Sequence, residues 1–251
     1  MSKINQLIQN WPKGTIKTVS ELKESGYSPQ VLKIYTTSKW LTLMGRGAYK
    51  LFNDDVDWTG GVYCIQRKKE SSVHVGGKTA LELKGFSHYV SQQKLHVELF
   101  GNESDALPKW FTKQAWMKNL NFYKSTLFEY NNLEAFTTAD VNNVIINISL
   151  PELAILEMLY LVPKVHSFEE TNLIIESLTT LRGELVQRLL EKCNSVKVKR
   201  IFLYLSEKYE HTWLNDLDET KIYLGSGKRE IVKNGMLDKK YNITVPKNYE
   251  E

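Results

Sequence analysis

The sequence is poor in the features that mark secreted and membrane-spanning proteins. It has only two cysteines among 251 residues, Cys64 and Cys193, and they stand far apart without a CxxC pair. We therefore expect both to be reduced and buried. It also has no run of 18 apolar residues and no apolar N-terminal segment typical of a signal peptide. These absences predict a cytoplasmic protein that does not contact a membrane.

Motifs of catalysis are equally scarce. No GxSxG elbow and no paired cysteine cluster occurs, and none of the histidines has HExxH spacing; they are His74, His88, His96, His166 and His211. Glu82 and Lys84 resemble the E-x-K of some metal-dependent nucleases, but residues two apart on a helix do not face each other. We therefore predict no catalytic residue, no metal site and no cofactor.

The stretch LGSGKREIVK at 224–233 has the look of a phosphate-binding loop but not its pattern. A P-loop reads G-x-x-x-x-G-K-[ST], and here Ile222 stands at the first glycine and Arg229 at the hydroxyl position. Downstream, apolar residues flank Asn234-Gly235 on both sides, which predicts a two-residue hairpin turn and no helix. We interpret the glycines as a flexible turn that leads Lys228 and Arg229 into this hairpin.

Charge is distributed unevenly along a chain of otherwise ordinary globular composition, with 42% hydrophobic and 25% charged residues. Residues 1–53 hold eight Lys/Arg and two Asp/Glu, a net charge of +6. Residues 54–181 have a net charge of −5 and residues 182–251 a net charge of +3. A small basic unit favours a phosphate-bearing partner such as nucleic acid. A charged, solvated surface explains the same charge if no other evidence is used.

Three helices are predicted in the basic unit. Apolar residues from Ile4 to Trp11 recur at helical spacing, and Pro12 ends this first helix. Thr18 can cap a short second helix that ends before Gly26. Ser28-Pro29 then combines a preferred N-cap residue with proline at the first helical position, which predicts the start of a third helix.

Two strand-like runs follow, Leu41–Met44 and Ala48–Leu51, joined by Gly45-Arg46-Gly47. Helices joined by a tight turn and followed by such a hairpin are typical of a winged helix-turn-helix. We predict this domain for residues 1–53.

A winged helix binds DNA by placing the N-terminal end of its third helix in the major groove. Gln30 can pair with adenine and Lys33 with guanine, while Arg46 suits a minor-groove or backbone contact. The full predicted DNA-binding set is Ser28, Gln30, Lys33, Thr37, Lys39, Arg46 and Lys50. The alternative is a winged helix that contacts proteins or serves only as a structural remnant.

Residues 54–251 predict a larger domain of mixed helices and short strands, so the fold class is α+β. Strands are expected at 73–75, 95–100 and 143–148. Capping boxes at Ser149–Glu152 and Ser167–Glu170 predict two helix starts, and leucines near 185–190 indicate a further helix.

A last helix is predicted from about Val196, with an apolar face opposite a basic one. Its basic face holds Lys197, Arg200, Tyr204 and Lys208. Such a face suits an anionic or acidic partner, and an ordinary solvated helix face has the same composition.

Six blocks of sequence resemble the AbiEi-type antitoxins of type IV toxin–antitoxin (abortive infection) systems, and they keep the family's order from end to end. The blocks are WLTLMGRGAYK (40–50), VHVGGKTALELKGFSHYV (73–90), LPKWF (107–111), SLPELAILEML (149–159), SVKVKRIFLYLSEKYEHTWLNDLD (195–218) and LGSGKREIVKNGMLDKKYNITVP (224–246).

The resemblance implies an antitoxin that is also a transcriptional autorepressor. Its winged helix would bind double-stranded DNA at inverted repeats in the promoter of its own operon. Its C-terminal domain, residues 54–251, would counter an AbiEii-type, nucleotidyltransferase-like toxin, without requiring a stable complex. The resemblance makes 195–218 and 224–246 candidates for the antitoxin surface, with Lys197, Arg200, Tyr204, Lys208, Lys228 and Arg229 as its residues.

The competing hypothesis is an enzyme, a nuclease or nucleotide-handling protein, that uses the winged helix as a targeting module. The family resemblance assigns no catalytic residue, and we expect none.

Overall fold

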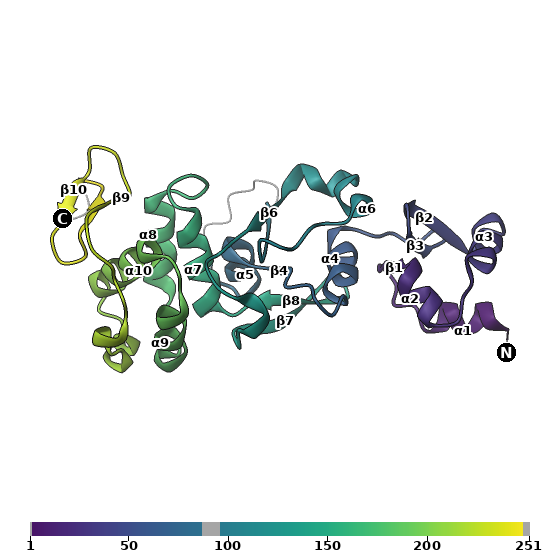
Figure 1. Ribbon diagram of the computed structural model, residues 1–251, viewed down its shortest axis with the longest axis horizontal. Helices are drawn as coiled ribbons and strands as arrows, with labels where there is room; N and C mark the ends of the chain where they lie inside the picture. Colours follow the sequence, from purple (N-terminus) through teal and green to yellow (C-terminus); the bar gives the residue numbers. More distant parts are fainter. Residues whose placement is uncertain (1, 87–95, 248–251) are drawn as a thin grey trace.

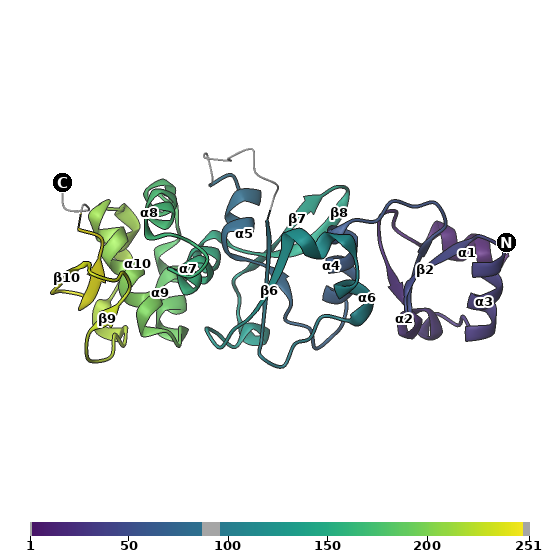
Figure 2. The ribbon, with the colours of Figure 1, turned by 90° about the horizontal axis from the view of Figure 1, so that it is seen from above.

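The computed structural model describes residues 2–86 and 96–247. Its elements follow one another along the long axis, from an N-terminal helical unit through a mixed sheet to a helical bundle and a small C-terminal sheet (Figure 1). The view from above shows the same progression (Figure 2). The chain is α+β, as predicted. His88 and the end of the 73–90 block lie outside the described residues.

The N-terminal unit is a winged helix with its own small core. Leu7, Trp11, Leu22, Leu32 and Leu41 are buried together there. Its antiparallel sheet has the order β1-β3-β2. The elements are α1 (Lys3–Gln9), β1 (Lys17–Thr18), α2 (Val19–Glu24), α3 (Pro29–Thr37), β2 (Leu41–Gly45) and β3 (Ala48–Leu51).

Both helix starts predicted in this unit are confirmed. The Thr18 side chain accepts a hydrogen bond from the backbone N–H of Glu21. The Glu21 side chain accepts one from the backbone N–H of Thr18, which completes a capping box at α2. Ser28 caps α3 by accepting from the Val31 N–H, without a reciprocal contact, and Pro29 is in the first turn. These caps fix where α3 begins, and so which of its side chains face outward.

The middle of the molecule is a five-stranded mixed sheet of order β6-β5-β4-β8-β7. Strands β4 and β8, and β5 and β6, are parallel, and the other pairs are antiparallel. The predicted strands near 73–75, 95–100 and 143–148 are present. The elements are α4 (Trp58–Gln66), β4 (His74–Val75), α5 (Gly77–Leu83), β5 (Val97–Gly101), α6 (Lys109–Thr112), η1 (Ala115–Asn119), β6 (Leu120–Lys124), η2 (Tyr130–Asn132), β7 (Phe136–Val141) and β8 (Val144–Ser149).

Helix α7 joins the sheet to the bundle that follows. Every residue from Glu152 to Leu159 is buried, because α7 packs against α5 on one side and against α9 and α10 on the other. The C-terminal elements are α7 (Pro151–Leu161), α8 (Phe168–Ser177), α9 (Gly183–Lys192), α10 (Val196–Lys208), η3 (Thr212–Asp216), η4 (Glu219–Lys221), β9 (Arg229–Glu230), β10 (Met236–Asp238) and β11 (Ile243–Val245).

The capping box predicted at Ser149–Glu152 is wrong. Leu150 is the N-cap of α7, because Pro151 occupies the first helical position. The Ser149 hydroxyl donates to buried Glu157 instead, at 2.8 Å. Glu152 pairs with Arg182. The second box is half correct: Ser167 caps α8, but the Glu170 side chain contacts His166 and Lys78.

The hairpin predicted around Asn234-Gly235 is also wrong. Asn234 has a left-handed φ of 56°, as turn residues do. The strands on its two sides, however, do not pair with each other. Both pair with β11, β10 antiparallel and β9 parallel, in the order β10-β11-β9. The antiparallel hairpin of this sheet is therefore β10–β11.

Candidate functional site

Helix α3 lies at the N-terminal end of the molecule (Figures 1 and 2). Leu32 is buried beneath it, whereas Gln30, Lys33 and Thr37 are exposed. These three residues lie three or four positions apart, so they share one side of the helix. The helix therefore offers amide, ammonium and hydroxyl groups on a single stripe that can enter a groove.

The predicted DNA-binding residues outside the stripe differ in how free their side chains are. Ser28, Lys39 and Arg46 are exposed, and Arg46 lies at the tip of the wing between β2 and β3. The Ser28 hydroxyl accepts from the Val31 N–H at 3.3 Å, so it also caps the helix. Lys50 is half-buried, and its Nζ donates to the carbonyl oxygen of Asp54 at 2.7 Å.

Ile34 was missed by the reasoning from sequence. It lies on α3 among the polar residues, with 59% of its surface exposed, and belongs to neither hydrophobic cluster of the described residues. Helical spacing carries the signal that finds it: Ile34 is four residues after Gln30 and three before Thr37.

The winged helix is held against the rest of the chain by a shared carboxylate. Glu21 Oε2 accepts from the Thr18 N–H at 2.7 Å, and Glu21 Oε1 accepts from Arg67 Nε, just after α4, at 3.2 Å. A Cβ on Gly60 would collide with the carbonyl oxygen of Gly14, so the two backbones require glycine to approach this closely. Glu21 thus links the start of α2 to Arg67, the C-cap residue of α4.

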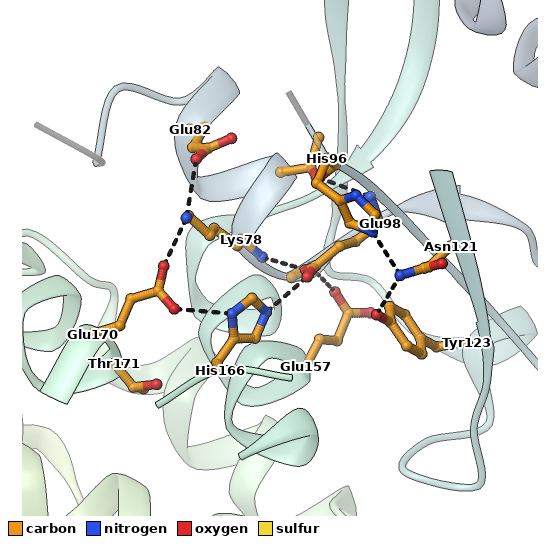
Figure 3. Close-up of polar contacts among 12 residues, drawn as sticks. Lys78, Glu82, His96, Glu98, Asn121, Tyr123, Glu157, His166, Glu170 and Thr171 are labelled. Atoms are coloured by element: carbon orange, nitrogen blue, oxygen red, sulfur yellow. Dashed lines mark hydrogen bonds and ion pairs between the residues drawn. The ribbon is translucent and has the colours of Figure 1, made fainter. Parts of the chain in front are cut away.

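The middle sheet encloses a network of buried ionisable groups (Figure 3). Glu98 on β5 and Glu157 on α7 are almost fully buried, and each accepts from a backbone N–H at the start of α5, Lys78 at 2.8 Å and Gly77 at 2.9 Å. A Cβ on Gly77, where φ is +52°, would collide with the Glu98 carboxylate. The Gly-Gly-Lys-Thr run therefore binds the protein's own carboxylates.

His166 connects this sheet to the helical bundle. Its ring nitrogens lie 2.7 Å from Glu98 and 3.2 Å from Glu170, and Glu170 also contacts Lys78 at 2.6 Å (Figure 3). Burial alone would lower the pKa of His166, but hydrogen bonds to the two carboxylates outweigh it and raise the pKa to about 9. The hydrogen bond from His166 holds the pKa of Glu170 near 2 against the opposing effect of burial. These contacts pair the charges of Lys78, Glu98, His166 and Glu170 with one another, and this cluster is called the ionic clamp below.

A cavity of about 540 Å³ lies beside β4, β7 and β8, with mostly neutral polar walls. His74 lines it, but both ring nitrogens are occupied, Nδ1 by the Ser72 carbonyl oxygen and Nε2 by Glu157, each at 2.7 Å. Both imidazole nitrogens are thus engaged within the fold.

The nuclease-like pair Glu82 and Lys84 is not brought together. Glu82 contacts Lys78 at 3.7 Å, while Lys84 Nζ lies 3.5 Å from the Thr138 carbonyl oxygen. Among the described residues, no group of three or more His, Cys, Asp or Glu side chains is placed to hold a metal ion. No helix in residues 2–86 or 96–247 is long and apolar enough to cross a membrane.

The prediction from sequence that Arg200 lies on an exposed basic face of α10 is wrong. Arg200 is only 3% exposed, and its guanidinium donates to four backbone carbonyl oxygens of the C-terminal segment. The acceptors are Leu224 at 2.8 Å, Gly225 at 3.1 Å, Gly227 at 2.6 Å and Asn242 at 3.2 Å. Burial, and next the charge of Arg229, lower the pKa of Arg200. Arg200 holds the C-terminal sheet onto α10.

Lys197 is also engaged within the fold. Its Nζ donates to the carbonyl oxygens of Tyr160 at 2.8 Å and Val162 at 2.6 Å, at the C-terminal end of α7. Burial, and next the charge of Lys164, lower the pKa of Lys197 to about 8. This ammonium satisfies carbonyls that the end of a helix leaves without partners.

The other predicted antitoxin residues are accessible. Lys208, Lys228 and Arg229 are exposed and Tyr204 is half-buried. Gly225 and Gly227 have φ values of +64° and +75°, so the glycine run is a turn, as predicted. The turn is bound by Arg200, and it leads Lys228 and Arg229 into β9.

Comparison with known proteins gives the same family over nearly the entire chain. Residues 1–92 match the family model described as "Transcriptional regulator, AbiEi antitoxin N-terminal domain". Residues 94–246 match "Transcriptional regulator, AbiEi antitoxin, Type IV TA system". A search of curated proteins finds no match.

The fold is similar to the crystal structure of the RV2827C protein from Mycobacterium tuberculosis. The TM-score is 0.63 at 11% sequence identity, over 96% of this chain and 88% of that chain. At this identity the likeness concerns the fold alone. The two family matches decide the classification: this chain belongs to the AbiEi antitoxins, the transcriptional regulators of type IV toxin–antitoxin systems.

Proposed function

We propose that this protein represses its own operon by binding inverted repeats in the promoter through α3 and the wing. In the same proposal, residues 54–251 counter an AbiEii-type, nucleotidyltransferase-like toxin, and this chain performs no catalytic step. Membership of a family of antitoxin regulators supports both parts. The observation that carries the DNA-binding part is the exposed stripe of Gln30, Lys33 and Thr37 on a capped helix.

The chemistry of this stripe fits the major groove of DNA. Gln30 is in the first turn of α3, where it can pair with adenine, and Lys33 can donate to guanine acceptors one turn later. Lys39 follows at the C-terminal end, where its ammonium can bind a phosphate. Thr37 lies beside it, but its hydroxyl donates to the Lys33 carbonyl oxygen at 3.0 Å and would have to turn away from it to donate to a phosphate. Arg46, at the wing tip, supplies a backbone or minor-groove contact.

The position of the winged helix suits a regulator that also has a second task. It lies at one end of an elongated molecule, with the C-terminal sheet at the other end (Figure 1). We propose residues 1–53 as the DNA-binding domain, with net charge +6. An inverted repeat would take two protomers, one on each half-site.

For the antitoxin surface we propose the accessible residues at the C-terminal end, Lys208, Lys228 and Arg229, with Tyr204 beside them on α10. Their charges suit phosphate on a nucleotide or on an RNA substrate of the toxin. Lys197 and Arg200 belong to the same segments, but their contacts with backbone carbonyls support a role in holding the surface in place.

A mobility-shift assay with the DNA upstream of the protein's own reading frame tests the DNA-binding part. We expect a shift at moderate salt that survives excess unrelated DNA. Replacing both Gln30 and Lys33 by alanine should abolish the specific shift, since both lie on the groove-facing stripe. Exposed Gln6 and Lys84, replaced together, form the matched control. Failure of the wild-type protein to bind its upstream region would reject this part.

A further inference from the structure

The stripe on α3 contains an aliphatic side chain that neither the helix nor the core requires. Ile34 is 59% exposed, whereas Leu32 on the same helix is fully buried. Val31 and Tyr35 are the partly buried α3 residues that pack on the small core, and Ile34 is absent from that group. Its apolar surface is therefore left to water in the free protein.

The neighbours of Ile34 on α3 favour a polar partner. Lys33, Gln30 and Thr37, respectively one, four and three positions away, are all exposed. An ammonium beside Ile34 would lose its hydration in an apolar protein interface, at a cost in free energy. A nucleic-acid groove accepts that ammonium, since it is lined by phosphates and by base acceptors.

Only one apolar group is displayed at the base edges of the major groove, the C5-methyl of thymine. An isoleucine side chain has no donor or acceptor, so it cannot read any other base feature. Four residues of helix rise about 6 Å, so Ile34 lies one or two base steps from the base that Gln30 meets. A groove-bound α3 therefore places its aliphatic group close to its adenine-reading amide.

We propose that Ile34 is a specificity-determining residue that reads a thymine methyl in each operator half-site. This inference rests on the proposed function, because it requires α3 to lie in the major groove. It adds recognition of the thymine methyl, a group with no donor or acceptor that the polar residues of the stripe could bind.

Thymine-to-uracil scanning of the operator duplex tests the proposal, because uracil removes only the methyl group and keeps the base pair. For the wild-type protein we expect one position in each half-site at which uracil weakens binding about fourfold, the value of one buried methyl. Ile34→Ala should bind the thymine operator about as weakly as the wild type binds the uracil operator, with no further loss on uracil. Ile34→Val should keep most of the sensitivity.

Exposed Leu173 on α8 provides the control, since Leu173→Ala removes a similarly exposed aliphatic group far from α3 and should leave the uracil effect intact. Thermal unfolding of Ile34→Ala should match wild type. The inference is overturned if no thymine shows the effect, or if Ile34→Ala keeps it. It is also overturned if Ile34→Ala changes only the oligomeric state. No binding of wild-type protein to its upstream DNA would instead reject the proposed function itself.

Discussion

At the scale of single residues, Arg200 secures the C-terminal segment. Its guanidinium binds carbonyl oxygens on both sides of the glycine turn and on Asn242. Planar donors in a fixed fork can satisfy several carbonyls at once, which an ammonium cannot do in the same geometry. The exposed cations Lys228 and Arg229 therefore depend on a buried one for their position.

We predict that Arg200→Ala destabilises the protein by about 3 kcal/mol or more, because buried carbonyls lose their donors. Arg200→Lys should recover only part of this. The free energy of unfolding in urea gives the measurement, and limited proteolysis should show early cleavage in the 224–244 segment. Arg188→Ala, an exposed arginine on α9, is the control. Equal stability of both variants would contradict this role.

The basic face of α10 shows why this role could not be predicted from sequence. Residues Val198, Phe202 and Leu205 form one buried, apolar side. The opposite side is covered by the C-terminal segment, which folds back over Arg200 from 24 to 42 residues further along the chain. Helical periodicity contains no information about such a distant cover, so a cation opposite the apolar side was interpreted as exposed.

His166 gives a residue-scale prediction about pH. Its pKa is about 9 in the folded protein and about 6.5 in the unfolded chain. Because folding raises its pKa, protonated His166 stabilises the folded state, and this contribution is fully present at pH values below about 6.5, the pKa in the unfolded chain. The contribution is lost as pH rises from about 6.5 through about 9. We predict that the free energy of unfolding of the wild type falls over that range by up to about 3 kcal/mol more than that of His166→Gln.

Urea unfolding across this pH range measures the difference. His96→Gln, which changes an exposed histidine, should follow the wild-type profile. A His166→Gln profile parallel to wild type would show that the ionic clamp does not contribute to stability through the charge of His166.

At the scale of elements, local signals place α3 and the wing. Caps at Thr18 and Ser28, and the turn at Gly45–Gly47, position them. Short-range signals were sufficient here, because caps and tight turns depend on residues only a few positions apart. Strands β6 and β7 had no such signal, since only Leu120 of β6 is buried and β7 has no fully buried residue.

For the wing we predict that Arg46→Ala weakens promoter binding and lowers the salt dependence of the affinity by about one phosphate contact per protomer. Rescue from the toxin should be unchanged, because Arg46 lies in the N-terminal unit. Binding isotherms at several salt concentrations, with co-expression rescue in parallel, check both statements. Equal loss of both activities would contradict the division of labour.

At the scale of the whole molecule, the surfaces proposed for DNA binding and for the antitoxin function lie at opposite ends, on α3 and near β9 (Figure 2). The resemblance in sequence identified the family, and the family models confirm it. The buried network of Glu98, Glu157 and His166 that connects the parts could not be predicted from sequence. Its members come from β5, α7 and the turn just before α8, and only the fold brings them together.

We predict that the triple change of Lys208, Lys228 and Arg229 to alanine abolishes rescue and leaves promoter affinity within about twofold. The charges removed lie at the C-terminal end, beyond the range of salt-screened interaction with DNA on α3. A control triple change of Lys84, Lys124 and Lys164, also exposed, removes the same charge away from α3 and the wing and should keep both activities. Rescue by the first triple variant would reject the proposed surface.

The central claim, that α3 reads the promoter, is tested most directly by quantitative footprinting of the upstream region with wild-type protein and the Gln30→Ala/Lys33→Ala variant. The account predicts two symmetric protected half-sites with wild type, and only weak, sequence-independent protection with the variant. Identical footprints for the two proteins, or no protected site with wild type, would contradict it.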